Sequence, residues 1–225
     1  MIKAIIKTKN PAFWIFMHII LGVVCTFIEE FFILWFFIAA ASSVNIITKG
    51  TRNDKAVNLL YLITYFSSFE LFARMTNAFK YGMPWEIGKY IVFFGAIYAV
   101  VVMQARKGAL GFLLFGLLVP AMFFGGQRDI TWHAIVFNLL GPFSIAFLVL
   151  AFTKIPFTKQ QFRQMLKLLL YPAISVLAYV FIKTPDLESM EFELEANFAT
   201  TGGYGSNQVS TILGMGLLIS FVFVI

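Results

Sequence analysis

The sequence has few charged residues and a single cysteine. Asp, Glu, Lys and Arg make up 12% of its 225 residues and hydrophobic residues 60%, whereas a soluble domain has roughly 25% and 45–50%. The one cysteine, Cys25, excludes a disulfide within the chain. There is no HExxH or CxxC motif, no other cluster with metal-ligand spacing, and no serine in a nucleophile elbow. These absences argue against a soluble fold, a metal-dependent enzyme and a serine hydrolase.

Apolar runs of membrane-spanning length recur along the whole chain. Because a transmembrane helix needs roughly 17–25 apolar residues, we expect an all-α polytopic bundle that forms one transmembrane domain over residues 1–225. The last run reaches the final residue without a polar anchor, so we expect this domain to be the N-terminal portion of a longer protein. The runs predict about eight spans, near residues 12–28, 31–47, 57–73, 89–104, 108–124, 134–152, 168–182 and 208–225.

Two local features modify these spans. Glu29 and Glu30 interrupt the first apolar stretch. One long helix would leave both carboxylates at the bilayer centre, at a cost of roughly 2.5–3.5 kcal/mol each, so we expect two helices joined by a tight acidic turn. Gly141 and Pro142 predict a kink inside the sixth span.

Lysine and arginine concentrate on alternate connections: the leader before residue 10, 49–55, 106–107 and 154–167. The positive-inside rule therefore predicts a cytoplasmic N-terminus, with the other connections outside. This distribution explains the net charge of +6 through membrane topology, so we do not expect a nucleic-acid partner. Within 154–167 the basic residues alternate with apolar ones at helical spacing, which predicts a short helix lying in the anionic cytoplasmic interface.

Two charged pairs lie on the outer side of the third and fourth spans. Glu70 and Arg74 are four residues apart, so they can pair on one helix face. This pair is either a salt bridge that fixes the helix end or part of a functional site, since charges at this depth are often functional. Glu86 and Lys89 repeat the pattern at the start of the fourth span, where an anchoring pair is the simpler interpretation.

Three further polar residues are candidates. Arg128 follows two glycines in a short outer loop and precedes His133, an arrangement that could contact an anion beside a general base. A loop arginine that is simply solvated remains the alternative. His18 lies deep in the first span, where we expect an interhelical hydrogen bond.

In the stretch 195–216, a glycine-rich loop runs directly into the last apolar helix. Its glycines can turn tightly and leave main-chain N–H groups facing an anion at the positive end of that helix. The alternative is a flexible loop before an ordinary helix N-terminus. The residues that would make such a site are Gly202, Gly203 and Gly205, followed by Asn207, Gln208 and Ser210.

The segment ANFATTGGYGSNQVSTILGMG resembles the signature of bacterial O-antigen ligases and O-antigen polymerase-like proteins, in which a G-G-[FY]-G-x-N-Q-V-S string opens a transmembrane helix. The earlier stretch FELFARMTNAFKYGMPWEIGKY is also similar to this group, with an arginine closing one span and E-x-G-K-Y opening the next. Together the two stretches cover about a fifth of the chain. The hydropathy pattern agrees with this group over nearly all of the chain.

This resemblance implies a GT-C-like fold and a metal-independent glycosyltransferase of the bacterial inner membrane that needs no cofactor. Such enzymes take a glycan from an undecaprenyl diphosphate carrier on the periplasmic face and join it to lipid A–core or a growing polysaccharide. Arg74 and then Arg128 would hold the diphosphate, while Gly202–Ser210 would supply backbone and amide contacts. The family's catalytic base belongs to a C-terminal half that this sequence lacks, so we expect it beyond residue 225. The alternative is a non-catalytic membrane subunit or a flippase-like carrier of polysaccharide export.

Overall fold

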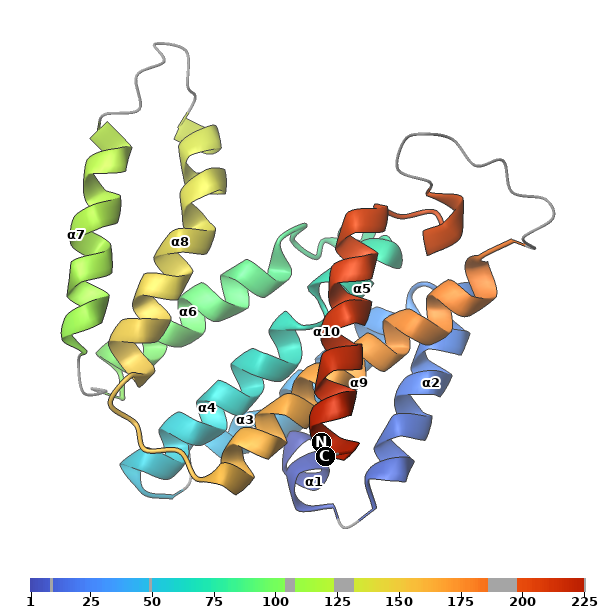
Figure 1. Cartoon of the computed structure of the whole chain (residues 1–225), viewed down its shortest axis with the longest axis horizontal. Helices are drawn as coiled ribbons and strands as arrows, with labels where there is room; N and C mark the ends of the chain where they lie inside the picture. The colour runs from blue at the N-terminus through green and yellow to red at the C-terminus, as the bar shows by residue number, and fades with distance from the viewer. Residues whose placement is uncertain (9, 49, 104–107, 124–131, 186–197, 225) are drawn as a thin grey trace.

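The computed structural model describes residues 1–8, 10–48, 50–103, 108–123, 132–185 and 198–224. Every regular element in these residues is a helix, which confirms the all-α class (Figure 1). Two short 3-10 helices, η1 (Ala78–Tyr81) and η3 (Ala199–Thr201), lie in connections. The α-helices are α1 (Ile2–Lys7), α2 (Pro11–Phe27), α3 (Phe31–Thr48), α4 (Arg52–Ser67), α5 (Glu70–Met75), α6 (Ile87–Val101), α7 (Ala109–Phe123), α8 (Trp132–Phe152), α9 (Lys159–Lys183) and α10 (Ser206–Val224).

Several helices have the length and composition of membrane spans. Four stretches within the described residues are long and apolar enough to cross a bilayer: α3, Arg52–Met75 (α4 and α5), α9 and α10. Helices α2 and α6, and the described parts of α7 and α8, are apolar but shorter. Large apolar side chains such as Phe16, Phe37 and Phe181 are exposed on these helices, as expected for surfaces that contact lipid rather than water. The helices indicate a membrane protein.

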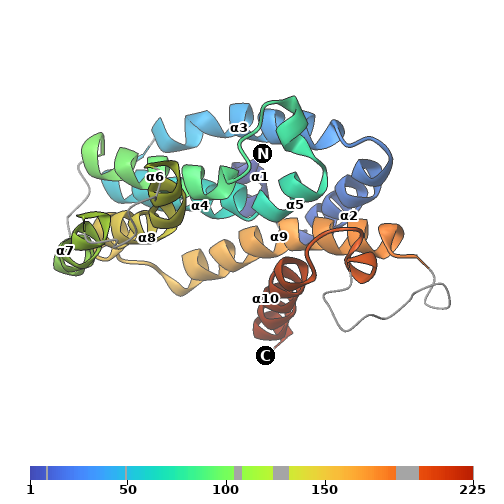
Figure 2. The same cartoon turned by 90° about the horizontal axis from the view of Figure 1, so that it is seen from above.

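Helix α9 is the centre of the larger helix group and packs against α2, α4 and α10 (Figures 1 and 2). Its contact with α2 is close because residue 22 is a glycine. A Cβ atom added to Gly22 would lie 2.4 Å from the Ser175 carbonyl oxygen. Small residues allow such approaches between apolar helices, where packing rather than water exclusion supplies the attraction.

A second group consists of α6, α7 and α8, with α8 packed on both of the others (Figure 1). Helix α4 joins the two groups because it also packs on α6. Gly111 of α7 permits close contact with α8, since an added Cβ would lie 2.5 Å from the Cα atom of Leu150. The two groups are thus held together through the helix that leads into α5.

The buried polar network around His18 confirms the predicted interhelical hydrogen bond. His18 is fully buried, its Nδ1 lies 2.7 Å from the Trp14 carbonyl oxygen and its Nε2 lies 3.0 Å from the Tyr65 hydroxyl. A carbonyl can only accept, so Nδ1 carries the proton and Nε2 accepts from Tyr65. Tyr65 in turn accepts from Trp35 Nε1 at 3.3 Å. This network links α2, α3 and α4 without leaving the imidazole or the Tyr65 hydroxyl unsatisfied.

The turn at Glu29 and Glu30 separates α2 from α3, as predicted. The expectation of a separate interfacial helix before the seventh span is wrong. Thr158 and Gln161 form a capping box, and α9 then runs for 25 residues without a break through the basic segment and the span. The helix also continues through Pro172. A single capped start therefore accounts for both segments.

Candidate functional site

Glu70 and Arg74 form an ion pair on α5, as their four-residue spacing predicts. The Arg74 Nη2 donates to the Glu70 Oε1, and the two side chains are only 13% and 23% exposed respectively. Burying charged side chains to this extent is costly unless each has a partner. The pair therefore stabilises both residues at the end of the Arg52–Met75 stretch.

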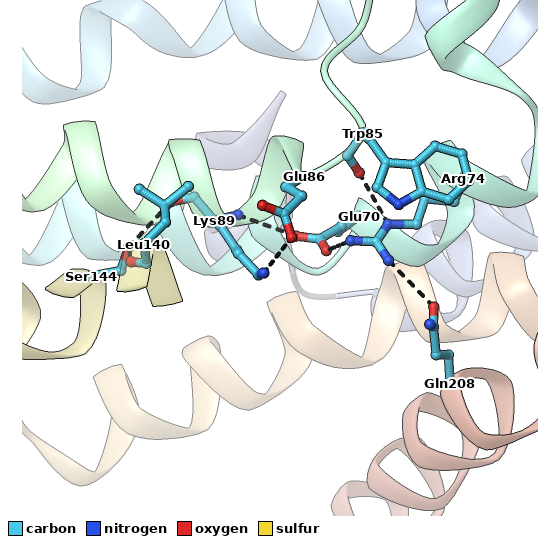
Figure 3. A network of polar contacts seen from close by, with 8 residues as sticks. All are labelled: Glu70, Arg74, Trp85, Glu86, Lys89, Leu140, Ser144 and Gln208. Carbon is cyan, nitrogen blue, oxygen red and sulfur yellow. Dashed lines mark hydrogen bonds and ion pairs between the residues drawn. The ribbon is translucent and has the colours of Figure 1, made fainter. Parts of the chain in front are cut away.

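Arg74 also connects α5 with two segments that are distant in the sequence (Figure 3). Its Nε donates to the Trp85 carbonyl oxygen at 3.0 Å, and its Nη1 donates to the Gln208 Oε1 at 3.4 Å. The guanidinium carbon lies 5.3 Å from the centre of the Trp85 ring, within cation–π range. The contact with Gln208 brings the predicted arginine and the glycine-rich segment together across 134 residues.

Gly88 is a site residue that the sequence did not reveal. The second Glu70 carboxylate oxygen accepts from the Lys89 main-chain N–H at 3.1 Å, at the beginning of α6. A Cβ atom on Gly88 would lie 2.5 Å from that oxygen and 2.8 Å from the Ser67 carbonyl oxygen. Only a glycine allows the start of α6 to approach Glu70 this closely. Gly88 is the glycine of the E-x-G-K-Y string, but that string alone does not indicate which carboxylate the start of α6 approaches.

Glu86 and Lys89 form the second ion pair of the cluster, in agreement with their interpretation as an anchoring pair. Glu86 is buried, and the Lys89 carbonyl oxygen accepts a hydrogen bond from the Ser144 hydroxyl of α8 at 3.4 Å (Figure 3). The four charged residues of the cluster comprise two acids and two bases. We call Glu70, Arg74, Glu86, Lys89 and Gln208 the Arg74 cluster.

The glycine-rich segment forms a compact turn before α10. Gly202 and Gly203 have φ angles of +67° and +84°, in the left-handed region that favours glycine. The Gly203 N–H donates to the Phe198 carbonyl oxygen at 2.9 Å, which closes the turn after η3. The Gly205 carbonyl oxygen accepts from the Gln208 and Val209 N–H groups at the start of α10.

These hydrogen bonds correct one part of the predicted anion site. The sequence suggested that the glycine N–H groups face an anion, but the Gly203 N–H is already used within the turn. An added Cβ at Gly203 meets nothing within 4 Å, so this glycine is required by its backbone conformation rather than by close approach of a neighbour. Of the polar residues after the turn, Gln208 reaches Arg74, whereas the Asn207 carbonyl oxygen accepts from Ser210 and Thr211.

Arg128, the second predicted anion contact, lies outside the described residues, as does the side chain of His133. Among the residues that are described, no group of three or more His, Cys, Asp or Glu side chains could hold a metal ion.

The acidic turn between α2 and α3 has partners of its own. The Asn77 Nδ2 donates to Glu29 at 3.1 Å, and the Lys80 Nζ lies 4.0 Å from the same carboxylate. The Tyr81 hydroxyl donates to Glu30, and this hydrogen bond lowers the pKa of the Glu30 carboxyl and raises the pKa of Tyr81. The two carboxylates therefore hold the η1 connection against the turn, a role that the sequence did not suggest.

The chain was compared with models of known protein families, with curated proteins and with solved structures, and none of the three comparisons found a match.

Proposed function

We propose that this chain belongs to a membrane glycosyltransferase of the O-antigen ligase or polymerase type, which transfers glycan from a polyprenyl diphosphate carrier. The observation that supports the proposal most directly is the contact between Arg74 and Gln208. These residues lie in the two sequence stretches that carry the family resemblance, and they meet at one site although 134 residues separate them.

The proposed topology has eight crossings in a GT-C-like bundle in the bacterial inner membrane. Support for this topology comes from the four long apolar stretches and the four shorter apolar helices in the described residues. Lysine and arginine concentrate on alternate connections, which favours a cytoplasmic N-terminus and a periplasmic Arg74 cluster. A lipid-linked diphosphate in the periplasmic leaflet would meet the cluster at the outer ends of the third and fourth spans.

Arg74 would hold the diphosphate and stabilise the charge that develops as it leaves. A guanidinium carries five N–H donors. Among the described residues, three of those of Arg74 serve Glu70, Trp85 and Gln208, so two would serve phosphate oxygens. Glu70 and Trp85 would keep the guanidinium plane fixed, so little side-chain entropy is lost when an anion binds. The Gln208 contact is the longest of the three, so a phosphate oxygen would displace it first.

The cluster balances its own charges, so a diphosphate would draw on further cations. Arg128 is our candidate for one of them. The turn at Gly202–Gly203 would position Gln208 and the N-terminus of α10 rather than bind the anion through its own glycines.

The test is a transfer assay with the full-length protein in lipid vesicles that contain a glycan on undecaprenyl diphosphate and an acceptor lipid A–core. We expect Arg74→Gln to lower transfer at least about 100-fold, because loss of one charge-stabilising donor costs roughly that factor. Arg163→Gln removes a positive charge from an exposed position on α9 and should transfer normally.

Transfer by Arg74→Gln at the wild-type rate would contradict the role of Arg74. If the wild-type protein binds the lipid diphosphate but transfers nothing to lipid A–core, protein or glycan acceptors, the glycosyltransferase proposal fails and a carrier is favoured.

A further inference from the structure

The beginning of α4 lies between two cavities that share Arg52 and Met103 as lining residues. The first has a volume of about 520 Å³ and is formed by α4, the end of α6 and the connection before α9. The second, about 400 Å³, lies between the end of α3, α4 and α6. Since a water molecule occupies about 30 Å³ in the liquid, each cavity has room for a group much larger than a single ion. We call the two together the Arg52 cavities.

Positive charge converges on these cavities from two segments. Arg52 and Lys55 come from α4, and Lys154 comes from the connection between α8 and α9. No acidic residue lines either cavity in the part of the chain that the structure describes. The neighbouring acid, Asp54, instead accepts hydrogen bonds from the Thr51 N–H at 3.1 Å and hydroxyl at 2.6 Å.

The cations also lack acidic partners elsewhere in the described part of the chain. The three ion pairs among the described residues use Arg74, Lys80 and Lys89, and none uses Arg52, Lys55 or Lys154. Exposed lysines and arginines with no acidic partner attract anions, most strongly where several converge beside a wall of low dielectric constant.

The remaining walls combine apolar residues with uncharged polar ones, among them Asn53 and Tyr98. Met103, Ile155 and Pro156 line the first cavity, and Ile47 and Val102 line the second. The cations therefore lie where apolar helices end, which is the depth of lipid headgroups for helices that span a bilayer. A ligand that joins a phosphate to hydrocarbon chains would satisfy both parts of the lining, whereas a soluble anion would use only the charges.

We propose that the Arg52 cavities bind the headgroup of an anionic phospholipid. The phosphate would lie between Arg52 and Lys154, and the acyl chains would follow the apolar surface of α6. Basic pockets between transmembrane helices recognise anionic headgroups in this way. The site is separate from the Arg74 cluster, because the 16 residues of α4 alone span about 24 Å.

The test is native mass spectrometry of the whole chain in detergent, titrated with phosphatidylglycerol, phosphatidylcholine or inorganic phosphate. We expect phosphatidylglycerol to bind at least about tenfold more tightly than phosphatidylcholine, since each basic residue near a membrane surface contributes several-fold in affinity. The double variant Arg52→Gln/Lys154→Gln should lose about tenfold in phosphatidylglycerol affinity. Both side chains are exposed, so the variant should fold, which an unchanged melting temperature would verify.

The matched control is Lys159→Gln/Arg163→Gln, which removes the same charge from exposed positions on α9 that do not line the cavities. It should bind phosphatidylglycerol within about twofold of the wild type. Equal losses in the two double variants would show general charge attraction and overturn the site. Binding of inorganic phosphate as tight as that of phosphatidylglycerol would overturn the lipid as the ligand.

Discussion

The arginines at the two ends of the Arg52–Met75 stretch lie in opposite environments. At one end, Arg74 is shielded from water and shared among a carboxylate, a carbonyl oxygen and an amide. At the other end, Arg52 is exposed, lines two cavities and forms no ion pair within the described residues. The first arrangement fixes a guanidinium in place, and the second leaves cations available to a mobile partner. A catalytic site needs a fixed guanidinium at its reacting centre. Binding of an anionic lipid headgroup needs only accessible cations.

The largest effect on stability should come from Gly88, where the Arg74 cluster is most tightly packed. Gly88→Ala places a Cβ atom 2.5 Å from Glu70 Oε2 and 2.8 Å from the Ser67 carbonyl oxygen. We expect a loss of about 1–3 kcal/mol in the free energy of unfolding, the usual cost of overpacking. Denaturation in detergent measures it. The control Gly116→Ala, in α7, meets nothing within 4 Å and should be neutral or stabilising.

A double-mutant cycle tests the pairing of Glu70 with Arg74. Arg74→Gln leaves a carboxylate that is 23% exposed without its cation, and we expect a loss of about 1–3 kcal/mol in the free energy of unfolding. Because Glu70→Gln removes the unpaired charge, the double variant should recover part of that loss. The same cycle at the exposed Arg52 with Asp54 should show no coupling, because the Asp54 carboxylate bonds to Thr51 instead. Additive losses at Glu70 and Arg74 would contradict the distinction between the two ends.

The turn that presents Gln208 should be sensitive to side chains at one glycine and not at another. Gly203 has a φ of +84°, so Gly203→Ala should cost about 1–2 kcal/mol in the free energy of unfolding. Gly205 is not among the described residues with positive φ, and an added Cβ there meets nothing within 4 Å. Gly205→Ala should therefore change stability by less than about half of that amount. Equal effects of the two substitutions on the denaturation midpoint would contradict the positive φ of Gly203 as the cause of the loss.

The smallest effect should be the pH dependence of the hydrogen bond between Tyr81 and Glu30, which lies on an exposed surface. The hydrogen bond lowers the pKa of Glu30 from its ordinary 4.5. A carboxyl group whose folded pKa is lowered stabilises the fold above its unfolded pKa, and this stabilisation is lost as the pH falls through the folded pKa. Wild type and Tyr81→Phe should therefore differ in melting temperature at pH 7, and the difference should shrink as the pH falls below the ordinary glutamate pKa of 4.5. A difference that does not change with pH would assign the effect to packing instead.

The sequence predicted what depends on local spacing and missed what depends on tertiary approach. The four-residue spacing gave the Glu70–Arg74 pair, and the depth of His18 in an apolar run gave its interhelical hydrogen bond. The resemblance placed Arg74 and Gln208 in one site, but their direct hydrogen bond requires packing of α10 beside α5, which no local pattern encodes. The role of Gly88 likewise depends on where α6 begins relative to Glu70.

One sequence interpretation was wrong and another was corrected in part, because local hydrogen bonds compete with the predicted arrangement. Basic residues in an apolar setting suggested an interfacial helix, but the capping box at Thr158 starts one continuous helix. Glycine N–H groups suggested an anion site, but the Gly203 N–H closes its own turn. The eight crossings and the GT-C-like arrangement stay predictions, and Arg128 lies outside the residues that the structure describes.

The most direct measurement is the affinity of the whole chain in detergent for undecaprenyl diphosphate, compared between wild type, Arg74→Gln and Arg163→Gln. If Arg74 holds the diphosphate, Arg74→Gln should weaken binding by about 10-fold to 100-fold, as expected for loss of a charge-assisted hydrogen bond. Arg163→Gln should bind as the wild type does. Equal affinity of wild type and Arg74→Gln would contradict the assignment of Arg74 as the diphosphate-binding residue.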